Sequence, residues 1–348
     1  MFVPVSGPRG FGEYARAREI ALGLFRRLPG VEIEFLLSRE APYASECPFS
    51  ATLLPSSPTF HPREVAEIFK ARRPNVVLFD NAGRTAQLRA AHEIGAKIIY
   101  ISSRKRQRRK AFRIHWMKML DEHWIAYPEF IAGSPSVMER LKLRILGKPS
   151  LQFLDTILPE GAPLRPGTAL RYGLVPGEYV LIVLGGGSAH QGAENAPYIA
   201  LSAATSLAQR RLPVAIVGNV SAEISPDTQL VTIPRQPMEE LLSLIEDAKI
   251  VVTNGGDTLL QVLALQKPCV ACPVAHDQAK RISRCASQGI LVESALDVSA
   301  IEHAAHALYY DDSRLQKLSR RLHDFPIENG LDVAVSAISE QLKSKASS

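Results

Sequence analysis

Residues 251–290 read VVTNGGDTLLQVLALQKPCVACPVAHDQAKRISRCASQGI. An apolar run ends in Asn254-Gly255-Gly256, a helix-length segment follows, and a second apolar run ends just before His276-Asp277-Gln278. Short apolar runs that alternate with helix-length segments are typical of buried parallel strands connected by helices. The stretch therefore predicts part of a parallel α/β sheet, with glycine and polar residues placed where its strands end.

The same alternation fills the first half of the chain. The Pro- and Ser-rich region at 43–60 is expected to be loop, with room for one short strand. Strands are expected near residues 1–6, 31–37, 75–80, 97–102, 122–126 and 150–154, and helices near 12–28, 62–72, 84–94, 105–120 and 134–143.

A second alternation begins after the segment at 158–177, which holds four prolines and four glycines and is expected to be a linker. Helices are expected to continue from Val298 to the end of the chain. Before them, strands are expected near 179–187, 213–218, 229–233, 249–253 and 268–273, and helices near 194–210, 237–248, 257–266 and 277–288.

Two successive alternations predict an α/β fold with two doubly wound, Rossmann-like domains that face each other across a cleft. A chain of 348 residues is also too long for one typical core. The predicted organisation is a first domain at 1–157, a linker at 158–177, a second domain at 178–330 and a C-terminal helix at 331–348. Ligands of such sheets bind at the carboxyl ends of the strands, so the cleft is the expected active site.

The composition is that of an ordinary globular protein, with 46% hydrophobic and 22% charged residues. No apolar run reaches 18 residues and the N-terminus does not resemble a signal peptide, so a cytoplasmic location is expected. Cys269 and Cys272 form a C-x-x-C pattern, but no second pair completes a four-ligand set. These cysteines are interpreted as small hydrophobes of a strand, and neither a metal nor a cofactor is expected.

Glycine follows three of the predicted strands, at 7–12, 185–187 and 255–256. Glycine lets the backbone approach a ligand closely, and the first turn of the helix that follows offers free N–H groups to phosphate. The alternative is that the glycines only make tight strand-to-helix turns. Neither a GxxxxGK[ST] nor a GxGxxG pattern is present, so the sequence does not indicate a P-loop ATPase or a dinucleotide-binding enzyme.

The order of these motifs resembles the C-terminal domain of GT-B glycosyltransferases, in particular MurG-like (family 28) and UDP-glycosyltransferase (family 1) donor domains. The resemblance covers roughly residues 178–345. It is carried by LGGGSA at 184–189, MEELLSLIEDAKIVVTNGGDT at 238–258, KPCVACPVAHDQ at 267–278 and Gly289.

The resemblance implies a role for each matching residue. The family commonly has Glu where this chain has Gln261, and several members have His where it has Asn254. For Asp277 and Gln278, an N-terminal capping turn is the alternative. The implied roles are donor diphosphate binding by Gly186, Gly187, Ser188, Asn254, Gly255, Gly256 and Thr258, ribose binding by Gln261, and donor-sugar binding by His276, Asp277 and Gln278.

The first half resembles the family more weakly, at the loop that follows its first strand. Gly10, Gly12 and Arg16 match the G-x-G-H-x-x-R form of this acceptor-side loop, whereas Glu13 replaces its His. A carboxylate at this place could remove the proton of the acceptor hydroxyl. The alternative is a first-turn Glu that the helix dipole favours.

The net charge of +6 and the pI of about 9.1 indicate an anionic partner. The excess positive charge is concentrated after one strand of the first domain. The segment has three possible interpretations: it binds an anionic membrane, it binds a phosphorylated acceptor, or it is only a solvated helix face. No nucleic-acid-binding motif accompanies the charge, so nucleic acid is not the expected partner. The basic residues of this segment are Arg104, Lys105, Arg106, Arg108, Arg109, Lys110 and Arg113.

Taken together, the patterns and the resemblance predict a glycosyltransferase that moves a hexose or N-acetylhexosamine from a nucleotide-diphosphate sugar, with UDP-sugar as the first choice. The acceptor is expected to be lipid-linked or otherwise anionic, as in the synthesis of cell-envelope polysaccharide or glycolipid, with the enzyme peripheral on the inner face of the membrane. The family likeness and the lack of a D-x-D motif near a glycine loop imply inversion without a bound metal. A nucleotide-sugar hydrolase or epimerase is the alternative on the same fold, and a noncatalytic binder of nucleotide sugars or polyanions is the alternative of another class.

Overall fold

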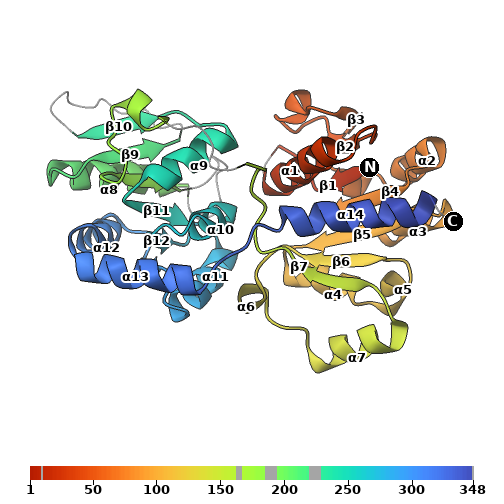
Figure 1. Ribbon diagram of the computed structural model, residues 1–348. Helices are drawn as coiled ribbons and strands as arrows, with labels where there is room; N and C mark the ends of the chain where they lie inside the picture. The colour runs from red at the N-terminus through yellow and green to blue at the C-terminus, as the bar shows by residue number, and fades with distance from the viewer. Residues whose placement is uncertain (9–10, 162–166, 185–193, 219–228, 347–348) are drawn as a thin grey trace. The chain divides into compact units, whose positions relative to one another are not determined.

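The computed structural model describes residues 1–8, 11–161, 167–184, 194–218 and 229–346. The chain divides into two compact units, one made of Met1–Leu158 with Asn329–Ser348 and one made of Pro159–Glu328 (Figure 1). Each unit is built around its own parallel sheet, with helices on both faces. The predicted fold class of two doubly wound α/β domains is confirmed.

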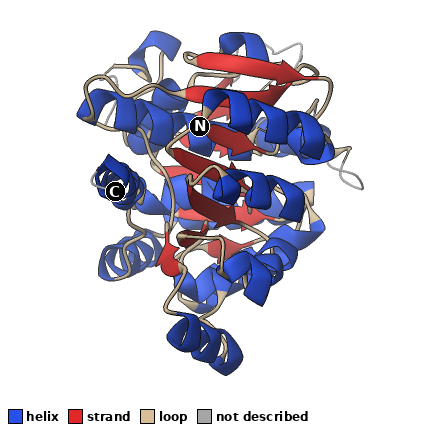
Figure 2. Ribbon diagram, turned by 90° about the vertical axis from the view of Figure 1, so that its right-hand side faces the viewer, coloured by secondary structure: helices blue, strands red, loops and turns tan. Residues whose placement is uncertain are grey.

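The first unit holds a seven-stranded parallel sheet in the order β3-β2-β1-β4-β5-β6-β7. The strand interiors are apolar because both faces of the sheet are covered, as Figure 2 shows. The strands are β1 Phe2–Pro4, β2 Glu34–Ser38, β3 Ser50–Leu54, β4 Val76–Asp80, β5 Lys97–Ser102, β6 Glu122–Ile125 and β7 Ser150–Phe153.

Successive strand residues point to opposite faces and so build two separate cores. On one face, Leu78 and Ile99 pack with α1 and α14. On the other face, Val77 and Ile98 pack with the helices that connect the strands. The helices of this unit are α1 Gly12–Arg27, α2 Pro62–Arg72, α3 Thr85–Glu93, α4 Lys105–Ala111, α5 Ile114–Met117, α6 Glu129–Ala132, α7 Val137–Leu146 and α14 Leu331–Ala346.

The last helix, α14, returns to the first unit and packs against α1. Gly23 on α1 allows this contact, because a Cβ there would lie only 3.1 Å from Leu331 and 3.2 Å from Val335. The N–H of Gly330 also donates to the carbonyl oxygen of Thr156 at 2.7 Å. The end of the chain is therefore part of the core of the first unit.

The second unit holds a six-stranded parallel sheet in the order β10-β9-β8-β11-β12-β13. Helices α8 and α12 pack together along one side of this sheet, and α9 contacts α10. The elements are β8 Val180–Val183, α8 Ala196–Gln209, β9 Val214–Val217, β10 Leu230–Ile233, α9 Met238–Asp247, β11 Ile250–Asn254, α10 Asp257–Ala264, β12 Cys269–Cys272, α11 His276–Ser287, β13 Val292–Glu293, α12 Val298–Tyr310 and α13 Asp312–Asp324.

Both sheets reverse their strand order at one point, between β1 and β4 in the first unit and between β8 and β11 in the second. Ligands of doubly wound sheets bind outside the carboxyl ends of the strands at this reversal. In the first unit it is flanked by the start of α1 and by Asp80 and Asn81. In the second unit it is flanked by Asn254 and the start of α10.

The predicted helix at 105–120 is wrong in its extent, because the structure has α4 and α5 with a break between them. Arg113 has extended backbone angles, φ −75° and ψ 132°. The break lets both Phe112 and Trp116 turn into the core, where Phe112 contacts the ring of His123 and Trp116 contacts that of Tyr100. The pattern of charged residues predicted one continuous helix and gave no sign that Phe112 and Trp116 both have to be buried.

The predicted helix at 134–143 begins later and ends later, as α7. Ser136 caps it by accepting a hydrogen bond from the N–H of Glu139, and the Glu139 side chain accepts one from the N–H of Ser136. Gly147 ends the helix with a φ of 66°. The two-residue strand β13 was not predicted, since a pair of residues has no periodicity to detect.

Candidate functional site

The carboxyl end of β11 is a tight loop in which side chains accept the N–H groups of both glycines. Oδ1 of Asn254 accepts the N–H of Gly256 at 2.9 Å, and Oε1 of Gln278 accepts the N–H of Gly255 at 3.2 Å. The sequence predicted that these N–H groups bind phosphate. In the structure, both of them donate to acceptors within the protein. Asn254 takes the place of His in this loop and stabilises its turn.

Gln278 ties this loop to the next strand end. Its Oε1 also accepts the N–H of Val274 at 2.9 Å, and its side chain is buried. A Cβ at Gly255 would lie 2.8 Å from Cβ of Gln278 and 3.0 Å from Ile282. Gly255 is therefore required by close packing against α11.

Arg281, one turn further along α11, reinforces the same contact and was not singled out from the sequence. Its Nη1 donates to the carbonyl oxygen of Gly255, and its Nη2 lies 3.7 Å from Oδ2 of Asp277. Only 8% of Arg281 is exposed. The spacing contains a signal for it, because residues 277 and 281 are four apart on one helix face. A buried guanidinium beside the start of α10 adds positive charge where an anion would bind.

Asp277 and His276 remain exposed at the start of α11, unlike Gln278. Helix α11 begins at His276 and its N-cap is Ala275, with no side-chain cap. Neither Asp277 nor Gln278 is therefore the capping residue of the helix. An exposed carboxylate at a strand end can accept two hydroxyl groups of a ligand.

Thr258 lies in the first turn of α10 and is partly exposed. Within the described part of the chain, neither its N–H nor its hydroxyl has a hydrogen-bond partner. These groups suit a phosphate at the start of the helix. Gln261, by contrast, is buried and directs its Nε2 toward the sulfur of Met238 at 3.4 Å. Ribose binding by Gln261 stays a prediction that would require this side chain to turn outward.

The other predicted phosphate loop, with Gly186, Gly187 and Ser188, lies outside the described residues, as does Gly10 of the acceptor-side loop. Gly12 is the first residue of α1. Their predicted roles are therefore untested.

In the first unit, Glu13 lies in the first turn of α1 and contacts Asn81, the residue that follows β4. Its Oε1 accepts a hydrogen bond from Nδ2 of Asn81 at 3.1 Å. The same Nδ2 donates to Oγ of Ser103, and Oδ1 of Asn81 accepts the N–H of Ser103 at 2.9 Å. Asn81 thus links three loops at the reversal of the strand order. It adopts a φ of 51°, a conformation in which Asn is enriched.

Arg16 lies one turn after Glu13 and forms a two-pronged ion pair with Asp80. Its Nε and Nη2 lie 2.8 and 3.0 Å from the two carboxylate oxygens, and the Asp80 side chain is fully buried. This pair fixes the start of α1 to the end of β4. The structure therefore gives Arg16 a positioning contact within the protein, and sequence reasoning missed its partner.

The basic segment contains two kinds of residue. Arg108 is largely buried and holds Glu139 at 3.0 Å as well as the carbonyl oxygens of Ala132 and Gly133. The assignment of Arg108 to a basic surface was therefore wrong, because this side chain anchors α4 to α6 and α7. The exposed members are Arg104, Lys105, Arg106, Arg109 and Arg113, and Lys110 is half-buried.

Cys269, Cys272 and Cys285 are buried free thiols. Burial raises the pKa of Cys272 and that of Cys285 to about 12, so both thiols are protonated at neutral pH. Among the described residues, no group of three His, Cys, Asp or Glu side chains is arranged to hold a metal ion. No helix in this part of the chain has the length and apolar composition to cross a membrane.

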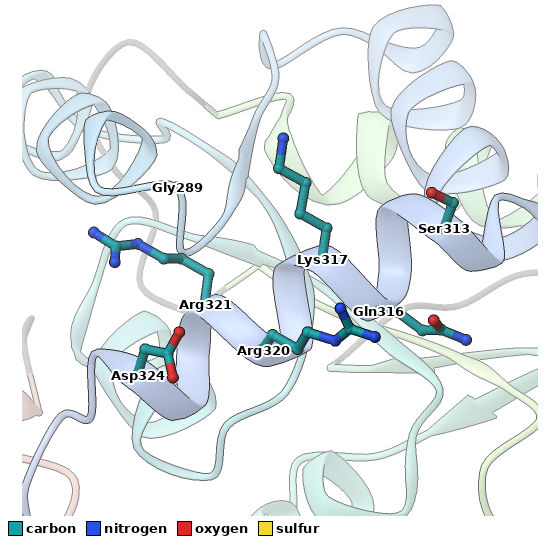
Figure 3. A pocket seen from close by; sticks show the side chains of 7 residues that line it. All are labelled: Gly289, Ser313, Gln316, Lys317, Arg320, Arg321 and Asp324. Atoms are coloured by element: carbon teal, nitrogen blue, oxygen red, sulfur yellow. The ribbon is translucent and has the colours of Figure 1, made fainter.

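A groove of about 590 Å³ lies in the second unit, but six of its seven lining residues come from one helix, α13 (Figure 3). The seventh, Gly289, lies between the end of α11 and the start of β13, which is the amino edge of the sheet. Lys317 and Arg320 extend in different directions from the helix, and Nε of Arg321 donates to the carbonyl oxygen of Gln288 at 2.7 Å. The groove therefore lies away from the strand ends described above.

Solved structures match nearly the whole chain. The kitacinnamycin glycotransferase has 16% sequence identity, the match covers 98% of each chain, and the TM-score is 0.66. The chain has the GT-B fold. Arabidopsis thaliana UGT89C1, solved with UDP, matches 97% of this chain and 99% of its own at 13% identity and a TM-score of 0.65. The Streptomyces sp. SF2575 glycosyltransferase SsfS6, solved with thymidine diphosphate, covers the same shares at 13% identity and a TM-score of 0.63.

No family model and no curated protein sequence matches the chain. At this level of identity the solved structures establish the GT-B fold alone. They agree with the resemblance that the glycine and Asp-Gln motifs indicated. The GT-B fold also places the two clusters, around Asn81 and around Gly255, at the strand ends where its two sheets reverse order.

Proposed function

We propose that the chain is a glycosyltransferase that moves a hexosyl or N-acetylhexosaminyl group from a nucleotide-diphosphate sugar, UDP-sugar first, to an anionic acceptor. The observation that carries this proposal is the cluster at the carboxyl ends of β11 and β12. There the first turn of α10 and two residues of α11, the buried Arg281 and the exposed Asp277, surround the Gly255 loop that Gln278 holds. An N-terminal helical turn and a guanidinium suit a diphosphate, and an exposed carboxylate suits sugar hydroxyls.

In the proposed reaction, the acceptor oxygen bonds to the anomeric carbon of the sugar. The bond from that carbon to the diphosphate oxygen breaks, and the nucleoside diphosphate leaves with the electron pair. Thr258 and Arg281 would stabilise the charge that grows on the leaving diphosphate. Glu13 would take the proton of the acceptor hydroxyl as general base. Inversion and independence of a metal ion are parts of this proposal.

A lipid-linked acceptor and a location on a membrane rest on the basic segment alone. Anionic vesicles, used as described in the next subsection, separate these possibilities from a soluble anionic acceptor.

The first experiment is a titration of the full chain with UDP, GDP, CMP and dTDP and with their common sugar conjugates, followed by thermal unfolding. Binding by one nucleotide family is expected to raise the unfolding temperature. Asp277→Ala should weaken the sugar conjugate at least tenfold and leave the bare nucleotide within twofold. No shift with any nucleotide at millimolar concentration would contradict the donor site. Release of the nucleotide from its conjugate without any acceptor would instead indicate a hydrolase.

A further inference from the structure

Four cationic residues of the first unit gather beside the start of α3. Arg106 and Lys110 are four residues apart on α4, which places them one turn apart on the same helix face. Arg113 is the N-cap of α5 and Arg84 is the N-cap of α3.

One hydrogen bond brings these helices together. Nε1 of Trp116 on α5 donates to Oγ1 of Thr85, the residue that follows Arg84, at 3.0 Å. Trp116 is buried, so the contact is part of the core and holds the two helices in place. Residues from the start of α3 and from the segment of α4 and α5 thus form one cationic cluster, defined here as Arg84, Arg106, Lys110 and Arg113.

Lys110 lies at the centre of the cationic cluster. Its pKa is lowered first by partial burial and then by the charges of Arg84, Arg106 and Arg113. The backbone agrees with this, because Arg106 lies one turn before Lys110 on α4 and the N–H of Arg113 donates to the carbonyl oxygen of Lys110 at 3.0 Å. A bound anion would offset the repulsion between these like charges.

Within the described residues, no carboxylate neutralises the cationic cluster, since none of its four members takes part in an ion pair. In the part of the chain that the structure describes, the one hydrogen bond from these side chains joins Nε of Arg84 to the carbonyl oxygen of Thr59 at 3.3 Å. Arg108 on the same helix shows the contrast, because Glu139 neutralises it. The positive charge of the cationic cluster is therefore available to a ligand.

The cationic cluster adjoins the polar group around Glu13. Asn81 and Ser103, which are bonded to each other, are three residues before Arg84 and two residues before α4. The segments that follow these two residues therefore carry the cationic cluster, beyond the carboxyl edge of the sheet where Glu13 also lies.

We propose that the cationic cluster binds the phosphate or diphosphate group of the acceptor. Guanidinium groups bind phosphate oxygens in pairs, and an ammonium group among them adds a point charge. The convergence of three guanidinium groups on a half-buried lysine fits a small multivalent anion. A flat lipid surface would also engage Lys105 and Arg109, which are exposed on the same helix. The assignment of this anion to the acceptor rests on the proposed function, whereas the anion site itself does not.

The direct test measures the binding of inorganic pyrophosphate to the full chain by calorimetry. The variant Arg106→Gln with Lys110→Gln is expected to lose at least tenfold in affinity for the first-unit site. The matched control, Arg89→Gln with Arg144→Gln, removes two exposed charges of the same unit and should bind within twofold of the parent. Equal binding by both variants would overturn the proposal. Lys110→Gln alone should unfold at a higher temperature without added anion, which also shows that the variant folds.

Kinetics test the link to the acceptor. With a phosphate-bearing acceptor, the double variant should raise the acceptor KM at least tenfold and leave the donor KM within twofold. If no nucleotide binds at all, the proposed transferase fails but the pyrophosphate result still decides the anion site. Vesicles of anionic phosphatidylglycerol provide the last arm. Loss of vesicle binding with unchanged pyrophosphate binding would replace the phosphate site with a membrane surface.

Discussion

Nδ2 of Asn81 donates a hydrogen bond to Oε1 of Glu13 at 3.1 Å and joins the end of β4 to the first turn of α1. Asn81 also donates from Nδ2 to Oγ of Ser103 and accepts the N–H of Ser103 at Oδ1, so the carboxylate of Glu13 is held at a fixed place on the sheet edge. A helix-dipole contact alone would leave this carboxylate free to rotate. The hydrogen bond is therefore consistent with a positioned proton acceptor.

If Glu13 is the general base, Glu13→Gln should lower kcat by about 10²- to 10⁴-fold and leave the donor KM within twofold. Gln keeps an oxygen for the hydrogen bond from Asn81 but cannot accept the proton. Asn81→Ala should lower kcat less, by about tenfold, with the donor KM unchanged, because it frees Glu13 without removing it. Steady-state kinetics of both variants, with unfolding temperatures as control, check this. A Glu13→Gln enzyme with parental kcat would remove Glu13 from the reaction.

Asp277 and Gln278 are neighbours in sequence but have opposite environments. Gln278→Ala leaves the N–H groups of Gly255 and Val274 without their acceptor and should destabilise the protein by about 1–3 kcal/mol. Asp277→Ala removes an exposed side chain whose Oδ2 lies 3.7 Å from Nη2 of Arg281, and should change stability by less than about 1 kcal/mol. Urea unfolding followed by circular dichroism measures both values. Equal losses of stability in the two variants would contradict the conclusion that Gln278 supports the loop from a buried position and Asp277 does not.

The pattern of residues predicted the fold class and placed the β11 loop correctly, because apolar strands and glycine turns are local features of a sequence. The partners of the site residues could not be predicted in this way. Asp80 meets Arg16 across 64 positions, and Asn81 meets Glu13 across 68. Such pairs can be predicted only when the order of the strands in the sheet is known. The sequence also assigned the glycine N–H groups to a ligand, since Gln278 gave no sign that it would turn inward.

Gly255→Ala provides a test of the packing at the β11 loop. The added Cβ would lie 2.8 Å from Cβ of Gln278, which cannot move without shifting α11, so a cost of about 1–3 kcal/mol is expected. At Gly256 the nearest atom is Oδ1 of Asn254, which can turn away only by giving up its hydrogen bond from the N–H of Gly256, a loss of about 0.5–1.5 kcal/mol, so Gly256→Ala should cost less than Gly255→Ala. Circular dichroism follows the whole chain during unfolding, and tryptophan fluorescence reports the first unit alone because Trp116 and Trp124 both lie there. The fluorescence transition should stay unchanged in both variants. A larger loss for Gly256→Ala would refute the packing argument.

His123 should make the first unit sensitive to acid. Its imidazole is buried between Ser102, whose Oγ lies 2.8 Å from Nε2, and the ring of Phe112, while Nδ1 has no partner among the described residues. Burial, followed by the charge of Arg108, lowers the pKa of His123 to about 3. The unfolded chain has the ordinary value of about 6.5 and so binds more protons between these two values, which means that stability falls as the pH falls through this window. From pH 7 to pH 5 the loss attributable to this group is about 2 kcal/mol.

Urea unfolding of the first unit, followed by tryptophan fluorescence at several pH values, measures this effect. His123→Gln keeps a polar partner for Ser102 but carries no titratable group, so its stability should fall by about 2 kcal/mol less than that of the parent between pH 7 and pH 5. His303→Gln, at an exposed position of the second unit, should retain the parental slope. If His123→Gln also retained the parental slope, the imidazole of His123 would be protonated in the folded state at pH 5. That result would contradict the conclusion that His123 is buried in its neutral form.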